Sequence, residues 1–224
     1  ECLLGENGFY GKRGFAIPEQ GDSGRGLKKE DFWMEFLFTE ENKLLRDMEE
    51  EWLAERKFGA YMLVGKSGSG KTAFLRQLDS DWQKQQNKKM ITWITTEQVI
   101  DSFLHGRDIL KELETSIVII ENMEDLAGKE NTLIYIFDLV HSWLAQGDRL
   151  FIGTSADSSL PVADYVTRLE SREIEITPGI VERIAQMKNI RLDRQCIDLL
   201  CREAEGRMAS LLGILHREML AGRI

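Results

Sequence analysis

The sequence predicts an α/β protein in which a parallel β-sheet is covered by helices on both faces and is followed by a smaller all-helical unit. Three observations lead to this prediction. A short apolar strand runs into a glycine-rich loop and a helix between residues 60 and 86. Further apolar strands and helical stretches alternate up to residue 176, and the chain beyond shows helical periodicity only. Such alternation is typical of parallel sheets, whose strands are joined by helical crossovers.

The glycine-rich loop has the spacing of a phosphate-binding loop. It reads Gly-Lys-Ser-Gly-Ser-Gly-Lys-Thr directly after the apolar strand, which matches G-x-x-x-x-G-K-T. We expect Gly65, Gly68 and Gly70 to allow left-handed backbone angles, so that successive N–H groups surround a phosphate. Lys71 can reach phosphate oxygens, and Thr72 can ligate Mg²⁺ at the start of the next helix. The loop predicts binding of ATP or GTP through Gly65, Lys66, Ser67, Gly68, Ser69, Gly70, Lys71, Thr72 and Ala73.

Hydrophobic periodicity predicts the remaining elements. We expect strands at residues 61–64, 90–94, 117–120, 150–152 and 173–176. Apolar side chains recur every three or four positions at residues 40–57, 72–86 and 131–145, which predicts helices there. Three more helices are expected at residues 179–187, 193–205 and 207–220. The first of these follows Thr177, a suitable N-cap, and has Pro178 in its first turn.

These elements divide the chain into three parts. Residues 1–30 are rich in glycine and have little apolar period, which predicts an irregular N-terminal arm. Residues 31–177 hold all the predicted strands and form the nucleotide-binding domain. Residues 178–224 hold the three C-terminal helices, whose apolar stripes predict a small bundle.

The composition excludes several classes of function. A net charge of −9 and a pI near 5.0 argue against a broad nucleic-acid-binding surface, which needs clustered Lys and Arg. No run approaches the roughly 20 apolar residues that span a bilayer. No secretory leader is visible, and the three cysteines lack C-x-x-C spacing. We therefore expect a cytoplasmic protein that does not enter a membrane.

Three further segments contain motifs beyond the phosphate-binding loop. Residues 119–132 read Ile-Ile-Glu-Asn-Met-Glu-Asp-Leu-Ala-Gly-Lys-Glu-Asn-Thr, which looks like I-D-D-I-Q-F-L-A-G-K-E-x-T. Residues 36–44 are similar to F-V-V-G-x-x-N-x-x, and residues 154–172 end in Arg-Leu-Glu-Ser-Arg, similar to R-L-x-S-R. These are motifs of the ATPase domain of the bacterial replication initiator DnaA, within the AAA+ class, and the resemblance covers residues 32–220. It implies a P-loop AAA+ domain with a five-stranded parallel sheet of order 5-1-4-3-2 and a C-terminal α-helical lid.

The resemblance also implies roles for individual residues. It places Leu37, Phe38 and Asn42 beside the adenine of ATP or ADP. It also assigns Glu121 and Thr72 to the coordination shell of Mg²⁺. The remaining correspondences are a sensor-I pair at Thr154 and Ser155, sensor arginines at Arg168 and Arg207, and an arginine finger at Arg172 that acts on a neighbouring subunit. Arg207 lies two residues before Ala209, which occupies the family's sensor-II position.

Two departures from the family motifs bear on catalysis. The family has two Asp after the strand, where this chain has Glu121 and Asn122. Glu121 can still serve the metal, whereas the Asn122 amide cannot act as a general base in hydrolysis. The Asp that follows the sensor-I pair has become Ala156. Because phosphoryl transfer depends largely on positioning and charge, we expect nucleotide binding with weak or absent hydrolysis.

The resemblance leaves alternative functions open. One hypothesis is an ATP- or ADP-dependent switch that regulates replication initiation by assembling with itself or with a full-length initiator. A second is an active ATPase that serves as a replication regulator or as a helicase or transposition loader. A third is a relic that keeps only the fold. The chain ends where the family's helix-turn-helix domain would begin, and residues 103–116 hold only Arg107 and Lys111 as cations, so we expect DNA binding to be weak or absent.

Overall fold

The computed structural model describes residues 2–5, 8–11, 36–84, 91–111 and 113–221, which belong to two compact units. One unit spans Phe38–Glu173, and the other comprises the described residues before Phe38 and after Glu173. The domain boundaries expected from the sequence stay predictions. None of the described helices combines the length and the apolar character needed to span a membrane.

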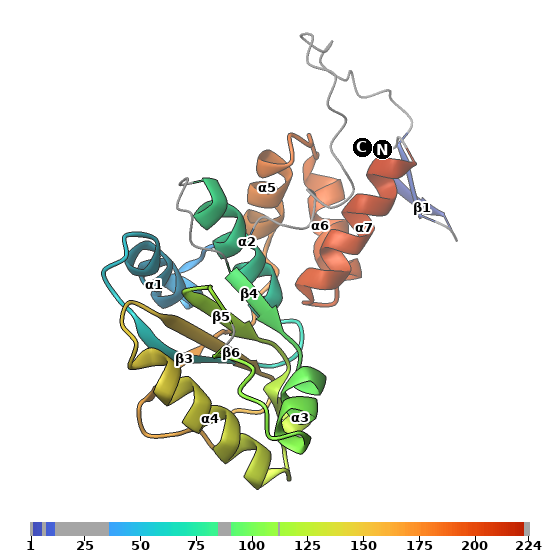
Figure 1. Ribbon diagram of the computed structural model, residues 1–224. Helices are drawn as coiled ribbons and strands as arrows, with labels where there is room; N and C mark the ends of the chain where they lie inside the picture. The colour runs from blue at the N-terminus through green and yellow to red at the C-terminus, as the bar shows by residue number, and fades with distance from the viewer. Residues whose placement is uncertain (1, 6–7, 12–35, 85–90, 112, 222–224) are drawn as a thin grey trace. The chain divides into compact units, whose positions relative to one another are not determined.

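A five-stranded parallel sheet forms the centre of the Phe38–Glu173 unit (Figure 1). Its strands are β3 (Gly59–Val64), β4 (Ile91–Ile94), β5 (Ile117–Ile120), β6 (Leu150–Ser155) and β7 (Val166–Glu170). They lie in the order β4-β5-β6-β3-β7, which confirms the predicted order 5-1-4-3-2. The register pairs Val64 of β3 with Ser155 of β6 and with Glu170 of β7, so these three strands end together at one edge.

The predicted fifth strand at residues 173–176 is wrong. The strand that pairs with β3 is Val166–Glu170, and residues 173–176 lie in neither a helix nor a strand. Ile174 and Ile176 are buried in the core of the other unit, so their alternation with glutamates reflects packing there. In Val166–Glu170, by contrast, two exposed residues stand between buried Val166 and Leu169, and this spacing concealed the strand.

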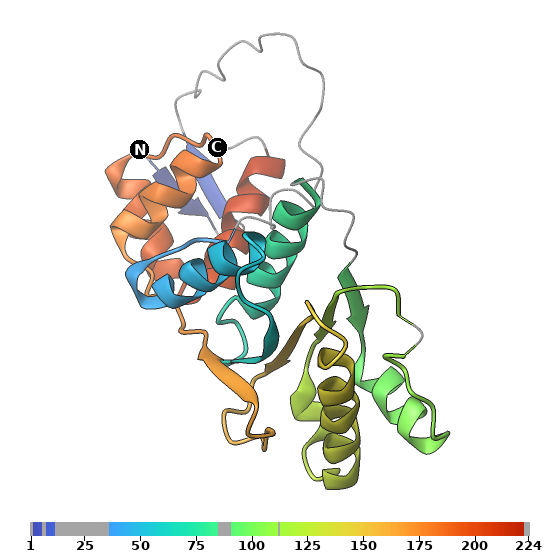
Figure 2. The same ribbon diagram turned by 60° about the vertical axis from the view of Figure 1, so that its left-hand side comes forward.

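Helices cover both faces of the sheet (Figures 1 and 2). They are α1 (Lys43–Leu53), α2 (Lys71–Lys84), α3 (Thr96–Leu104) and α4 (Glu130–Leu144), with short 3-10 turns η1 (Glu40–Asn42) and η2 (Met123–Leu126). On one face, Met62 of β3 belongs to an apolar cluster with Ile136 of α4. On the other face, the ring of Tyr61 lies 5.1 Å from that of Trp52 in α1. Successive residues of β3 therefore point into two different cores, as expected for a central strand.

The second unit contains a helical bundle and a pair of short strands. Its helices are α5 (Pro178–Met187), α6 (Arg194–Glu203) and α7 (Met208–Leu220), and their buried residues form one apolar cluster. The expected cap of α5 is present, because the Thr177 hydroxyl accepts a hydrogen bond from Ile180 N–H at 3.3 Å. Strands β1 (Cys2–Gly5) and β2 (Gly8–Gly11) pair in antiparallel fashion. The prediction of an irregular arm is therefore wrong for these residues, and residues 12–30 lie outside the described part of the chain.

Candidate functional site

The candidate site lies where the central strands of the sheet end. Gly65 follows β3, Glu121 follows β5 and Ser171 follows β7, and all three positions are at the carboxyl edge of the sheet. Open parallel sheets bind their ligands at this edge. The glycine-rich loop connects β3 to α2, so it lies at the carboxyl end of an inner strand of the sheet.

The glycines of the loop serve two different physical purposes. Gly68 and Gly70 have φ values of +87° and +89°, the left-handed conformations expected from the sequence. Gly65 does not have positive φ, so the same expectation is wrong for it. Gly65 is required for space: a Cβ there would lie 2.2 Å from the carbonyl oxygen of Ser171 and 2.7 Å from Ser69 Oγ. The first glycine thus permits β7 to pack against the loop.

Ser171 holds the end of β7 against the loop. Its N–H donates to the carbonyl oxygen of Val64 at 2.7 Å, and its hydroxyl donates to the carbonyl oxygen of Ser69 at 2.9 Å. On the other side, Gly65 N–H donates to the carbonyl oxygen of Ser155 in β6 at 3.1 Å. The loop is therefore attached to both neighbours of β3. The contact through Ser171 was not anticipated, because a single serine between charged residues carries no distinguishing sequence signal.

The lysine of the loop lies against the loop's own backbone. Lys71 is partly buried, and its Nζ donates to the carbonyl oxygens of Gly65 at 2.5 Å and of Lys66 at 3.0 Å. Burial lowers the pKa of Lys71, while the carboxylates of Glu124 and then Glu121 oppose that shift. The ammonium group thus belongs to the first residue of α2, directly after the glycine-rich loop, and this arrangement is suited to phosphate.

The two predicted metal ligands are in contact. Thr72 Oγ1, at the start of α2, donates a hydrogen bond to Glu121 Oε1 at 2.6 Å. Hydroxyl and carboxylate oxygens are ligands that Mg²⁺ prefers, and it usually takes one or two such protein groups together with phosphate oxygens. Among the described residues, no group of three or more His, Cys, Asp or Glu could hold a metal alone. The Thr72–Glu121 pair therefore fits a magnesium ion that also binds a nucleotide.

Asn122 and the predicted sensor-I pair, Thr154 and Ser155, lie beside the first residue of the loop. Asn122 is exposed and has φ of 57°, and its N–H donates to Thr154 Oγ1 at 3.1 Å. Thr154 and Ser155 are both buried, and the Ser155 hydroxyl donates to the carbonyl oxygen of Asp157 at 3.0 Å. These contacts join the ends of β5 and β6. The side chain of Asn122 adds an amide to this edge and no carboxylate.

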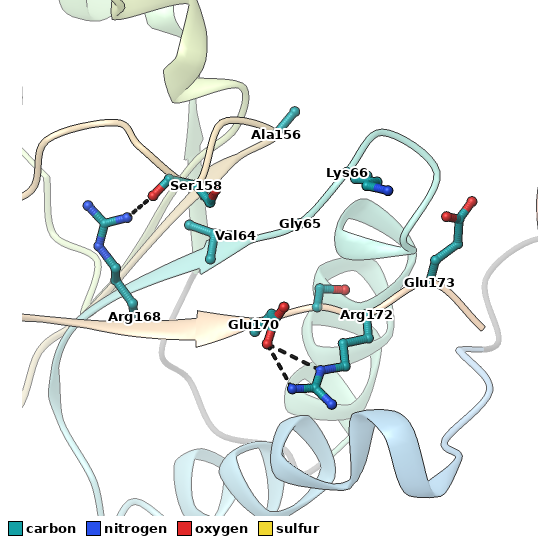
Figure 3. Close-up of a pocket in the computed structure, with 10 residues that line it drawn as sticks. Val64, Gly65, Lys66, Ala156, Ser158, Arg168, Glu170, Arg172 and Glu173 are labelled. Carbon is teal, nitrogen blue, oxygen red and sulfur yellow. Dashed lines mark hydrogen bonds and ion pairs between the residues drawn. The ribbon is translucent and has the colours of Figure 1, made fainter. Parts of the chain in front are cut away.

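A pocket of about 460 Å³ lies beside the loop (Figure 3). Lys66 and Arg172 are among its lining residues, whereas Lys71 and Thr72 are not. The pocket thus flanks the loop on its β7 side: Gly65 and Lys66 of the loop line it, whereas Lys71, Thr72 and Glu121 do not. The charge of Lys71 and the two candidate metal ligands therefore lie outside this pocket.

The two arginines of the pocket have different surroundings. Arg168 donates to the carbonyl oxygens of Ser158 and Leu160, so its guanidinium is engaged by the preceding loop. Arg172 pairs with Glu170 at 3.1 Å, and both side chains are more than 60% exposed, at 64% and 63%. Figure 3 shows this pair among the residues that line the pocket. Arg172 is therefore accessible to another molecule, while Arg168 is hydrogen-bonded to the segment that precedes β7.

The structure brings only some of the other predicted residues to this edge. Phe38 and Asn42 belong to the same unit as the loop, and the Phe38 ring lies 6.3 Å from that of Phe74 in α2. Asn42 is buried, and its Oδ1 accepts the Thr39 N–H at 2.7 Å. Leu37 lies in the core of the helical unit, and Arg207 is the N-cap residue of α7. The proposed nucleotide contacts of Leu37 and Arg207 remain predictions.

Comparison with known proteins identifies the family. The model of the bacterial DnaA ATPase domain matches residues 29–175. The AMPPCP-bound DnaA from Aquifex aeolicus is similar at a TM-score of 0.65 and 19% identity, over 84% of this chain and 64% of that one. Domain III of DnaA from Thermotoga maritima matches at 0.66 and 16%, over 86% of this chain and 91% of that one.

The similarity extends to an ORC1 protein. The ORC1 protein of Aeropyrum pernix, solved in complex with DNA, matches at a TM-score of 0.61 and 14% identity, over 88% of this chain and 62% of that one. At such identities the solved structures establish the AAA+ P-loop fold, and the chain spans 64% of the length of the AMPPCP-bound DnaA. The family match covers well over half of the chain. The protein belongs to the bacterial DnaA ATPase domain family.

Proposed function

We propose that this protein binds ATP or ADP with Mg²⁺ and acts as a nucleotide-dependent switch in the regulation of DNA replication initiation. The observation that carries the proposal is the contact between Thr72 and Glu121 at 2.6 Å, beside the ammonium group of Lys71. Lys71 and the loop amides would hold the phosphates, and Thr72 and Glu121 would hold the metal. The adenine would contact Leu37, Phe38 and Asn42. The AMPPCP-bound DnaA of Aquifex aeolicus supports a nucleotide at this loop.

Hydrolysis by this protein is proposed to be slow. A bound Mg²⁺ would neutralise charge on the phosphates. The residue after Glu121 is Asn122, whose amide has no oxygen basic enough to accept a proton from water. General bases contribute about 10²- to 10⁴-fold to such reactions. Bound ATP would therefore be converted to ADP more slowly than with a carboxylate at position 122, which is a property suited to a switch.

Assembly with another protein would depend on whether ATP or ADP is bound. Arg172 is exposed, and its ion pair within the described part of the chain is with exposed Glu170, a contact worth at most about 1 kcal/mol, so Arg172 can be released with little loss of stability. The proposed partner is a second copy of this chain or a full-length initiator whose γ-phosphate Arg172 would contact. Thr154, Ser155, Arg168 and Arg207 would act as sensors of the bound nucleotide. Different affinities of ATP and ADP for two arrangements of the helical unit would bias the assembly.

Direct DNA binding has little support in the described residues. Arg107 is paired with Asp101 at 2.9 Å, and the net charge of the chain is −9. Free cations are the main source of affinity for phosphate backbones. The DNA-bound ORC1 protein and the DnaA structures suggest that regulation concerns replication, and we propose that this chain reaches DNA through its partner.

The second candidate function is that of an active ATPase, favoured by the intact Thr72–Glu121 pair and by exposed Arg172. One experiment separates the two functions. The purified protein is incubated with Mg²⁺ and labelled ATP, and the bound nucleotide is identified over several hours. Retained ATP supports the switch, steady conversion to ADP supports the ATPase, and failure of the folded protein to bind ATP contradicts both.

A further inference from the structure

The turn after β5 carries a second carboxylate whose position has a chemical consequence. Asn122 adopts a left-handed conformation, with φ of 57° and ψ of 42°, and this reverses the direction of the chain. The Asp125 N–H then donates to the carbonyl oxygen of Asn122 at 2.9 Å and closes the η2 turn. The chain after Glu121 is therefore folded back along the edge of the sheet and does not run away from it.

The turn is fixed to strand β6 by an apolar contact. Met123 is fully buried in the core between the sheet and α4. It packs so closely on Gly153 that a Cβ at that glycine would lie 2.6 Å from Met123 Sδ. This anchor determines where the next residue, Glu124, can place its side chain.

Glu124 extends to the end of β6. Its Oε2 accepts a hydrogen bond from the Ala156 N–H at 3.0 Å, and the side chain is partly buried. Among the residues that the structure describes, no Lys or Arg forms an ion pair with Glu124. One carboxylate oxygen is thus held by the backbone, and Oε1 makes no hydrogen bond to any described residue. The two positions beside it, Asn122 and Ala156, are uncharged and do not repel it.

The partner of Glu124 connects it to the phosphate-binding loop. Ala156, which donates to Glu124, directly follows Ser155, and the carbonyl oxygen of Ser155 accepts the Gly65 N–H at 3.1 Å. Glu121 is bonded to Thr72 and is committed to the proposed metal ligands. Glu124 is therefore a carboxylate beside the phosphate-binding loop that the proposed metal site does not use.

We propose that Glu124 is a catalytic residue, and that its carboxylate orients the water that attacks the γ-phosphate of ATP in place of Asn122. This proposal rests on the proposed nucleotide-binding function. The water oxygen forms a bond to the γ-phosphorus, the bond from that phosphorus to the bridging oxygen of ADP breaks, and ADP leaves with the electron pair. Glu124 accepts the water proton and returns it to solvent. Its reach across the η2 turn makes the geometry less direct than a residue at position 122, in accord with slow turnover.

The test is a comparison of Glu124→Gln with Asp125→Asn. Gln keeps an oxygen that can accept the Ala156 N–H, so the contact with β6 is preserved while the basic group is removed. Asp125 is the next residue of the same turn, and its substitution removes the same charge. Single-turnover hydrolysis and equilibrium affinity for ATP are measured for both variants and the wild type, with thermal unfolding as a check of folding.

We expect Glu124→Gln to lower the hydrolysis rate by about 100-fold, with affinity for ATP changed less than about threefold. Asp125→Asn should retain the wild-type rate, and Glu124→Asp, which is one methylene shorter, should have an intermediate rate. An unchanged rate in Glu124→Gln, or wild-type protein that binds ATP and never hydrolyses it, would overturn the proposal for Glu124 alone. Absence of ATP binding by folded wild-type protein would instead overturn the proposed function itself.

Discussion

Substitution of Gly65 by Ala tests how the phosphate-binding loop is held on the sheet. The new Cβ would lie 2.2 Å from the carbonyl oxygen of Ser171, and contacts of a Cβ below 3.0 Å essentially do not occur. The backbone at Ser171 or at the loop must therefore move by about 0.8 Å, the difference between the two distances. The carbonyl is part of the main chain, so rotation of a side chain cannot relieve the clash.

The cost of this movement can be worked from the contacts that it disturbs. The Ser171 N–H bond to Val64 at 2.7 Å and the Ser171 hydroxyl bond to Ser69 at 2.9 Å both cross the displaced boundary. Each such bond contributes about 0.5–1.5 kcal/mol, and overpacking costs about 1–3 kcal/mol. We expect Gly65→Ala to lower the free energy of unfolding by about 2–4 kcal/mol. A displaced loop should also lose at least about tenfold in affinity for ATP.

The assay combines urea unfolding with equilibrium titration of a fluorescent ATP analogue. Gly213→Ala is the control: Gly213 lies within helix α7, and a Cβ there would have no atom within 4 Å. In a helix this change stabilises by up to about 1 kcal/mol and should leave nucleotide affinity unchanged. The reasoning would be refuted if Gly65→Ala had the stability and the affinity of the wild type.

Three further predictions concern the metal, a buried acid and the exposed arginine. Thr72→Ala should abolish the gain in ATP affinity that Mg²⁺ gives over EDTA, because the hydroxyl beside Glu121 is lost; a persistent gain would contradict the assignment. Glu49 is 5% exposed, and burial, with repulsion from Asp81 second, raises its pKa from 4.5 to about 7. The folded state then binds a proton that the unfolded chain has released, so the free energy of unfolding should fall by up to about 3 kcal/mol between pH 4.5 and 7. Glu49→Gln should flatten this slope in urea unfolding at pH 5 and pH 8, and an unchanged slope would exclude Glu49 as its source. Arg172→Ala should leave stability within about 0.5 kcal/mol and ATP affinity unchanged, yet lower any assembly-stimulated hydrolysis at least about tenfold, and equal stimulation in the variant would remove its proposed role.

Local patterns in the sequence sufficed for much of the fold. Apolar runs with strong periodicity located β5 at residues 117–120 and the helices α1, α2 and α4, and the confirmed strand order followed from the family motifs. The prediction of the fifth strand was wrong because a β-strand and an extended segment that packs on helices produce the same alternation of apolar and polar residues, here at residues 173–176. Which of the two structures forms depends on the surface that covers the segment, and residues far away in the sequence supply that surface.

The site shows the same division. The spacing of the loop was sufficient to predict Lys71 as a phosphate ligand and Thr72 as a metal ligand, because the motif consists of consecutive residues. The contact of Ser171 with Ser69 joins residues that are 102 positions apart, and no local pattern reports it. The placement of Glu124 against Ala156 likewise depends on the left-handed turn at Asn122, which only the folded chain reveals. The sequence shows that the carboxylate at position 122 is lost, whereas the contact of Glu124 with Ala156 joins residues that are 32 positions apart and has no local sequence signal.

The central claim is that the loop from Gly65 to Thr72 holds the phosphates of ATP, and equilibrium titration of labelled ATP into wild-type protein and Lys71→Met tests it most directly. Met keeps the apolar part of the side chain and removes the charge, whose hydrogen bonds are worth about 1.5–3 kcal/mol. The account predicts saturable binding of one ATP per wild-type chain and an affinity about 10- to 150-fold lower in Lys71→Met. Equal affinity of the two folded proteins, or no binding by the wild type, would contradict it.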